Sequence, residues 1–148
     1  MAKKIFKGRP CLPGNIGGEA AVSRLGFSTS AAWIDIMLKG SESTICTDGD
    51  NRDLYGKELG GKILCIPQTI GSSSASCLMM IMAEKKIGPK AWLFSRHIDS
   101  LAAGGLLLAD IWLDHRSITI DLLGDEFLDY VNTGDPVTVH ADGTVEVG

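Results

Sequence analysis

Several features that mark common classes of protein are missing from this 148-residue sequence. No apolar run reaches the roughly 18 residues of a membrane-spanning helix, and no long apolar segment follows the basic residues of MAKKIFKGRP, as a secretory signal would require. Acidic residues outnumber Lys and Arg by 18 to 14, which leaves a net charge of -4 and no basic footprint. We therefore expect a cytoplasmic protein with no nucleic-acid or membrane partner.

Metal-binding motifs are also missing. The four cysteines stand at wide, irregular spacings: Cys11, Cys46, Cys65 and Cys77. With no CxxC pair, the sequence predicts neither a zinc ribbon nor an iron–sulfur cluster on this chain, and we expect free thiols, with Cys65 and Cys77 in the core. The three histidines are far apart and have no metal-ligand spacing: His97, His115 and His140.

What is present fits a single α/β domain over residues 1–148. Hydrophobic residues make up 45% of the chain and charged residues 22%, an ordinary globular balance. We predict strands at 3–6, 19–22, 33–38, 62–66, 91–94, 111–113, 117–121, 137–140 and 144–147. We predict helices at 74–87, 100–109 and 126–131, turns at 9–18 and a long loop at 40–53. This order predicts a βαβ core with parallel strands, while the two ends form an antiparallel β layer.

A polar cluster, PQTIGSSSASC (residues 67–77), stands between the apolar strand KILCI and the predicted helix. Gly71 allows a positive φ or a close backbone approach to a ligand. Ser72, Ser73 and Ser74 lie near the helix N-cap, where unpaired N–H groups and the helix dipole bind a carboxylate or phosphate and ease ionisation of a serine hydroxyl. GxxxxGK[ST] and GxSxG are both absent. The alternative is a structural cluster in which one serine caps the helix and the others are solvated.

Four longer stretches resemble the small subunit of aconitase X enzymes, in the same order along the chain. They are KGRPCLPGNIGGEAAVS, LYGKELGGKILCIPQTIGSSSAS, PKAWLFSRHIDSLAAGGLLLADI and GDPVTVHADGTVEV. The resemblance implies a swivelling β/β/α domain like that of aconitases, here a separate chain that forms a heterodimer or larger complex with a large subunit.

The resemblance also implies site residues and a cofactor. The family's catalytic serine falls on Ser72, which would act as the general base of a dehydration, and Gly71, Ser73 and Ser74 match neighbouring, substrate-binding positions. The iron–sulfur cluster would be bound by the large subunit, where it assists departure of the substrate hydroxyl, and this chain would bind no metal.

The sequence departs from the family at residues 27–40, FSTSAAWIDIMLKG, where many members carry FGGVDP-x-TG and Asp35 is only a weak counterpart. Two dehydrations are known in the family, of cis-3-hydroxy-L-proline and of mevalonate 5-phosphate. Because the serine loop lacks the basic residues that a phosphate favours, the sequence favours conversion of cis-3-hydroxy-L-proline to Δ1-pyrroline-2-carboxylate, with mevalonate 5-phosphate as the alternative substrate.

Two functions of other classes stay open at this point. The chain could be a non-catalytic module that binds a small carboxylate through the serine loop. It could also resemble swivelling phosphohistidine carriers, although no histidine stands in a glycine-rich loop at a helix start.

Overall fold

An eight-stranded sheet with strand order β1-β8-β7-β3-β4-β5-β6-β2 forms the centre of the structure. The computed structural model describes residues 2–71 and 73–148. The strands are β1 (Lys4–Lys7), β2 (Arg9–Leu12), β3 (Ile16–Val22), β4 (Ile63–Ile66), β5 (Ala91–Phe94), β6 (Ile118–Asp121), β7 (Pro136–Val139) and β8 (Thr144–Val147). The helices are α1 (Thr29–Lys39), α2 (Ala75–Lys85), α3 (Ser100–Trp112) and α4 (Asp125–Tyr130). None of the helices in the described ranges is long and apolar enough to cross a membrane.

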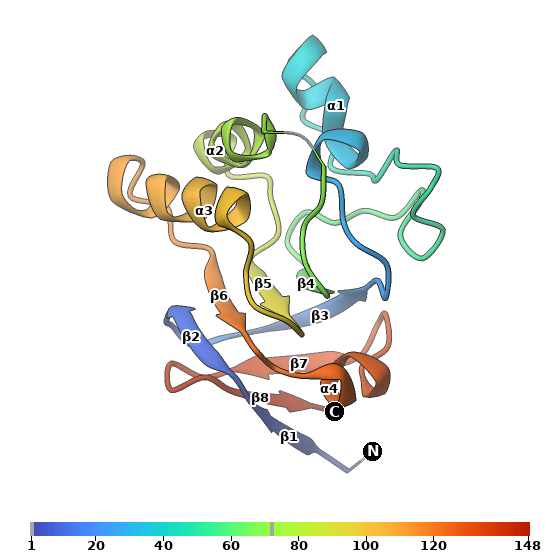
Figure 1. Cartoon of the computed structure of the whole chain (residues 1–148), viewed down its shortest axis with the longest axis vertical. Helices are drawn as coiled ribbons and strands as arrows, with labels where there is room; N and C mark the ends of the chain where they lie inside the picture. The colour runs from blue at the N-terminus through green and yellow to red at the C-terminus, as the bar shows by residue number, and fades with distance from the viewer. Residues whose placement is uncertain (1, 72) are drawn as a thin grey trace.

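The middle of the sheet is parallel and its flanks are antiparallel. Strands β3, β4, β5 and β6 run parallel, whereas β7, β8 and β1 continue outward from β3 in antiparallel pairs. In Figure 1, α1, α2 and α3 lie on one side of the parallel strands, and β1, β7, β8 and α4 lie on the other. The predicted α/β class, with a parallel βαβ core and an additional β layer, is confirmed.

Alternate side chains of the central strands enter two separate cores. Leu64 and Ile66 of β4 pack in the core beneath the helices, whereas Ile63 and Cys65 pack in the core shared with the antiparallel layer. Strand β5 alternates in the same way, and all four of its residues are buried. Because both faces are covered, these strands appear in the sequence as continuous apolar runs, which is why they could be predicted.

The prediction of a strand at residues 33–38 is wrong, because this segment belongs to helix α1. The Ser28 side chain accepts a hydrogen bond from a backbone N–H of the first turn, and Gly40 ends the helix in a left-handed conformation, with a φ of 65°. Trp33 and Ile36, three residues apart, are both buried. The apolar spacing therefore follows a helical period, and the two caps fix the ends.

Two other predicted segments also differ. Residues 111–113 continue α3 and its C-cap rather than forming a strand; Ile111 and Trp112 are 69% and 72% exposed, so their apolar character does not signal burial. Part of the segment 9–18, predicted as turns, forms β2, which pairs antiparallel with β6. Pro10 is tolerated there because β2 is an edge strand, and its register shifts after this residue.

Helices α2 and α3 approach each other closely at a glycine. A Cβ on Gly105 would lie 2.9 Å from Ser76 Cα and 3.0 Å from Met79 Sδ, whereas a Cβ on Gly104 would meet only Ser76 Oγ, at 3.6 Å. The Ser76 hydroxyl also donates a 2.5 Å hydrogen bond to the carbonyl oxygen of Leu101. The adjacent glycines of α3 therefore have different roles, and Gly105 sets the distance to α2.

Replacing these glycines by alanine tests this contact. Gly105→Ala should lower the free energy of unfolding by about 1–3 kcal/mol, since the added methyl group meets the α2 backbone. Gly104→Ala is the matched control and should raise it by up to about 1 kcal/mol through helix propensity. Urea unfolding of both variants measures the difference; equal effects at the two positions would contradict the close-packing explanation.

Candidate active site

The serine loop, residues 67–74, leaves the carboxyl end of β4 and leads into α2 (Figure 1). The structure describes three of the predicted site residues, Gly71, Ser73 and Ser74, whereas Ser72, the predicted base, lies outside the described residues. Strands β5 and β6 are parallel to β4, so their carboxyl ends meet at the same edge of the sheet. Ligands collect at this edge in open α/β sheets.

Gly71 has the backbone conformation that the sequence suggested. Its φ is +102°, a conformation that L side chains rarely adopt, and a Cβ at this position would lie 3.1 Å from the Ser28 hydroxyl oxygen. The loop therefore passes close to the N-cap of α1 at this point; the positive φ favours glycine, and a Cβ would require the Ser28 hydroxyl to shift.

Ser74 stands at the N-cap of α2, and among the described residues its side chain makes no capping hydrogen bond. Its backbone is helical, with φ -73° and ψ -6°, and its Oγ lies 3.0 Å from the Oγ of Ser30 in α1. Ser73 is exposed. Ser74 thus connects α1 with α2.

Residues 27–40, for which the sequence predicts a departure from the family pattern, contact the serine loop at their start. The N–H of Phe27 donates to the carbonyl oxygen of Gln68 at 3.0 Å, and the N–H of Ile70 donates to the carbonyl oxygen of Phe27 at 2.9 Å. Asp35 lies further along α1, where it pairs with Lys39 one turn on, at 3.7 Å. It is therefore the start of α1, and not Asp35, that lies against the loop.

An open pocket of about 370 Å³ adjoins the loop. Its lining comes from the start of α1, the loop before β4 and the serine loop: Leu25, Gly26, Ser28, Ala31, Asp48, Asp50, Asn51, Ile70 and Gly71. Asp48 and Asp50 are the charged members of this lining, and no Lys or Arg of the described residues belongs to it. Asn51 is 2% exposed, and within the described residues its Nδ2 has no hydrogen-bond partner.

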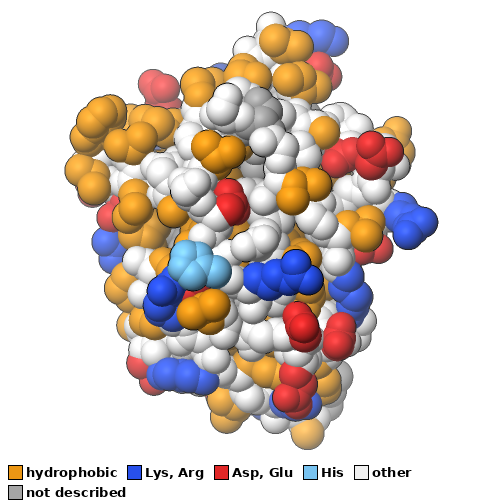
Figure 2. All heavy atoms as spheres, viewed as in Figure 1, with side chains coloured by type: hydrophobic (Ala, Val, Ile, Leu, Met, Phe, Trp, Pro, Cys, Tyr) orange, Lys and Arg blue, Asp and Glu red, His pale blue; other side chains and the backbone are white. Residues whose placement is uncertain are grey.

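Few Lys and Arg side chains lie on the surface around the carboxyl edge of the sheet, as in the pocket lining. Figure 2 shows hydrophobic and uncharged side chains over most of the upper half of this face, above α2 and α3, while most of its Lys and Arg side chains lie in the lower half. A hydrophobic group at the upper left covers the end of α3, which carries the exposed Ile111 and Trp112.

The first residues of the serine loop are held by the turn between β5 and α3. The side chain of Gln68 donates to the carbonyl oxygen of His97 at 2.7 Å. The N–H and the hydroxyl of Thr69 both donate to Oδ1 of Asp99, at 3.1 and 2.6 Å. Oδ2 of the same carboxylate caps α3 by accepting from the N–H of Ala102 at 3.1 Å. One carboxylate therefore joins the loop to the helix.

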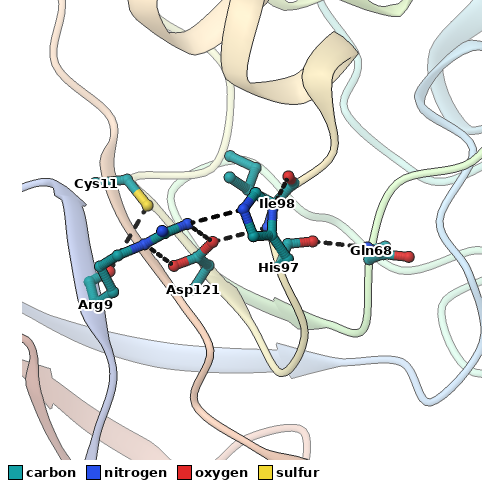
Figure 3. Close-up of polar contacts among 6 residues, drawn as sticks. All are labelled: Arg9, Cys11, Gln68, His97, Ile98 and Asp121. Atoms are coloured by element: carbon teal, nitrogen blue, oxygen red, sulfur yellow. Dashed lines mark hydrogen bonds and ion pairs between the residues drawn. The ribbon is translucent and has the colours of Figure 1, made fainter.

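A buried carboxylate in turn holds that connecting turn (Figure 3). Asp121, at the end of β6, is 0% exposed; it accepts from the N–H of Ile98 at 2.8 Å and from Nε and Nη2 of Arg9 at 2.9 and 2.6 Å. Nη2 of Arg9 also lies 3.3 Å from Nε2 of His97. This pairing joins the edge strand β2 to the turn that holds the serine loop.

The electrostatics of Asp121 favour its charged form. Burial opposes ionisation, but hydrogen bonds from the Arg9 guanidinium and from the N–H of Ile98 outweigh it and hold the pKa of Asp121 below its ordinary value. The carboxylate in turn raises the pKa of Arg9. The pair is therefore ionised at neutral pH.

Sequence reasoning did not identify this supporting network. Arg9 and Asp121 are 112 residues apart, and only the pairing of β2 with β6 brings them together. A signal for Asp99 was present, since an aspartate directly before a helix is a common N-cap. Nothing in the sequence, however, indicates that its second oxygen binds Thr69.

The cysteines do not form a ligand set. They are free thiols; Cys65 is buried, and burial raises the pKa of its thiol, but Cys77 is exposed, which contradicts the prediction that it lies in the core. The reason is the helical period, which points Cys77 away from the face of α2 that packs Leu78 and Met82. Across the described ranges, no three His, Cys, Asp or Glu side chains are grouped to hold a metal ion.

The lowered pKa of Asp121 predicts a pH dependence of stability. Its ionised form is favoured in the folded state, so this stabilisation is complete above the ordinary aspartate pKa of about 3.9 and is lost as the pH falls through the lower, folded value. Asp121→Asn should therefore destabilise the protein at pH 7, and the difference from wild type should shrink between about pH 4 and pH 2. Urea unfolding across this range measures it.

Asp110 provides the control for that series. Its pKa is also lowered by an arginine, Arg116, whose Nε lies 2.7 Å from Oδ1, but this pair is on the surface. Asp110→Asn should cost less stability at pH 7. A difference between Asp121→Asn and wild type that stays constant down to pH 2 would contradict the assignment.

Comparison with known proteins agrees with this architecture. Over 98% of both chains, the structure is similar to the crystal structure of Thermococcus kodakaraensis aconitase X in its holo-form, with a TM-score of 0.81 and 27% identity. The chain is 27% identical to the phosphomevalonate dehydratase small subunit of Archaeoglobus fulgidus, over 96% of this chain and 97% of the relative. It is 33% identical to that of Pyrococcus furiosus over 72% of this chain and 73% of the relative.

The family match covers nearly the whole sequence. Residues 5–147 match the family described as the aconitase X swivel domain. This span includes the serine loop, the supporting turn after β5 and the strands of both layers. The chain therefore belongs to the aconitase X swivel-domain family, in agreement with the motifs of its sequence.

Proposed function

We propose that this chain is the small subunit of a two-subunit dehydratase and that Ser72 is its general base. The observation that carries the proposal is Gly71, whose positive φ turns the loop at the wall of the pocket, one residue before Ser72. Two of its relatives bear the name of a dehydratase small subunit. Residues 1–148 would act as one swivel domain.

The chemistry of a dehydration defines the task of the serine. A proton leaves the carbon next to the carboxylate, the hydroxyl leaves the adjacent carbon, and a double bond forms between them with net loss of water. Ser72 would accept the proton, which requires its hydroxyl to be ionised beforehand. Backbone N–H groups at the start of α2 favour such an anion through the helix dipole, and Gly71, Ser73 and Ser74 would supply donors to the substrate.

The substrate we propose is a small hydroxy acid without a phosphate group, with cis-3-hydroxy-L-proline as the candidate. Asp48 and Asp50 in the pocket lining are complementary to the ring ammonium of this amino acid and would repel a phosphate. Arg24, next to the pocket residue Leu25, donates instead to the carbonyl oxygens of Asp129 and Val131, at 3.2 and 3.0 Å. Loss of the α-proton and the 3-hydroxyl gives an enamine that tautomerises to Δ1-pyrroline-2-carboxylate.

Mevalonate 5-phosphate is the second candidate, and the names of the relatives favour it. Phosphomevalonate dehydratase small subunits match this chain at 27% to 35% identity. For this substrate, the cations that bind the phosphate would come from the large subunit, since the pocket lining of this chain offers acidic residues.

The large subunit is required by the proposal for another reason. The aconitase X family implies an iron–sulfur cluster, and the thiols of this chain differ in burial and belong to no group of metal ligands in the part of the chain that the structure describes. We propose that the large subunit binds the cluster and that the cysteines of this chain take no part in binding it.

Ser72→Ala tests the proposed base. In the complex, this change should lower kcat by about 10²- to 10⁴-fold or more, the usual effect of losing a positioned base. The two subunits should still associate. Ser73→Ala is the matched control and should lower kcat less, whereas Ser76 is unsuitable because its hydroxyl joins α2 to α3. If Ser72→Ala instead loses roughly 0.5–2 kcal/mol of stability and keeps near-normal turnover, the serine is a helix cap and the non-catalytic alternative gains support.

Assays on both substrates test the second part of the proposal. The complex of this chain with its large subunit should convert cis-3-hydroxy-L-proline to Δ1-pyrroline-2-carboxylate. The assay measures the rate at which this product forms. The small subunit alone is the control and should be inactive and bind no iron. If the complex converts mevalonate 5-phosphate but not cis-3-hydroxy-L-proline, the proposed substrate is wrong. The proposed role of Ser72 is not affected by this result.

A further inference from the structure

The serine loop is held by hydrogen bonds from residues that do not themselves line the pocket. Thr69 stands two residues before Gly71 and is 7% exposed, so its hydroxyl is shielded from water. That hydroxyl donates to Oδ1 of Asp99 at 2.6 Å, and the N–H of Thr69 donates to the same oxygen at 3.1 Å. Charge-assisted bonds of this length are among the stronger hydrogen bonds of proteins.

Asp99 is fixed from both sides. Its Oδ2 accepts from the N–H of Ala102 and so belongs to the first turn of α3. The residue before it, Ile98, donates its N–H to the buried carboxylate of Asp121, which Arg9 holds with two hydrogen bonds (Figure 3). The carboxylate that binds Thr69 is therefore tied to a helix and, through the turn, to the end of β6.

We propose that Thr69 and Asp99 form a clamp that positions the serine loop for proton transfer, anchored by the Arg9–Asp121 pair. Both are positioning residues, since they act through the loop rather than on the substrate. The inference rests on the proposed role of Ser72, because its kinetic consequence requires a catalytic group on the loop. It adds to that role by identifying what holds the loop in place.

The geometry allows one bond of the clamp to be removed alone. Thr69→Val keeps the shape of the side chain, the N–H bond to Asp99 and the α3 cap, and it removes only the hydroxyl bond. Thr69→Ser restores a hydroxyl at the same position. Thr119→Val is a control for the general cost of losing a buried hydroxyl, since Thr119 is 1% exposed and its hydroxyl donates to the carbonyl oxygen of Ser117, at 2.9 Å, rather than to the serine loop.

The test uses the purified complex of both subunits. Thr69→Val should lower kcat by about 10- to 100-fold, the effect of a small misplacement of a catalytic group, with KM within about twofold of wild type. It should also speed amide hydrogen exchange in peptides covering residues 67–76. Thr69→Ser should recover most of kcat and of the protection from exchange, and Thr119→Val should leave both unchanged.

The two readouts separate this inference from the function on which it rests. Unchanged exchange of the loop in Thr69→Val would overturn the clamp, whatever Ser72→Ala does. Faster exchange with unchanged kcat would overturn its positioning role. Full activity of Ser72→Ala would overturn the proposed base, while the exchange data would still report whether the clamp holds the loop. Equal losses of kcat in Thr69→Val and Thr119→Val would overturn the clamp, because the loss would then reflect a general decrease in stability.

Discussion

The burial of the central parallel strands on both faces constrains the rest of this protein. Helices α1, α2 and α3 cover one face and the antiparallel layer with α4 covers the other (Figure 1). Every side chain of β4 and β5 is therefore buried in one of the two cores. Polar side chains that could bind a ligand follow these strands at their ends. The serine loop, the turn that carries Asp99 and the buried carboxylate of Asp121 all lie at or beyond the carboxyl ends of the parallel strands.

At the carboxyl edge of the sheet, burial of the Asp121 carboxylate opposes folding, because a charged group is removed from water. An unpaired carboxylate with no exposure would be strongly destabilising, and Arg9 together with the N–H of Ile98 compensates it. The geometry that satisfies this charge also fixes the turn after β5. Stability and loop position thus depend on the same hydrogen bonds, while the close contact of α2 with Gly105 fixes the helix that begins at the loop.

Residues 27–40, where the sequence indicates a departure from the family pattern, contact the serine loop through their first residues. The hydroxyl of Ser28, the N-cap of α1, lies close to Gly71, and the hydroxyl of Ser30 in the first turn contacts that of Ser74. Ser28 and Ala31 also line the pocket. A change of sequence in the first turn of α1 would alter the lining of the pocket without changing the serine loop. The proposal of a substrate without a phosphate group rests on the composition of this lining, whereas the names of the relatives favour the phosphorylated substrate.

The sequence by itself determined the α/β class, the central strands, the serine loop and the family, because continuous apolar runs and local motifs depend on neighbouring residues. It did not determine α1, where a strand was predicted. Ser28 and Gly40 are recognisable as caps only once the segment is known to be a helix, and that helix depends on the burial of Trp33 and Ile36. Only the tertiary structure decided that Arg9 pairs with Asp121 and that Asp99 holds Thr69. These contacts join residues about 30 to more than 100 positions apart, and their partners are chosen by the order of the strands in the sheet, which no local pattern encodes.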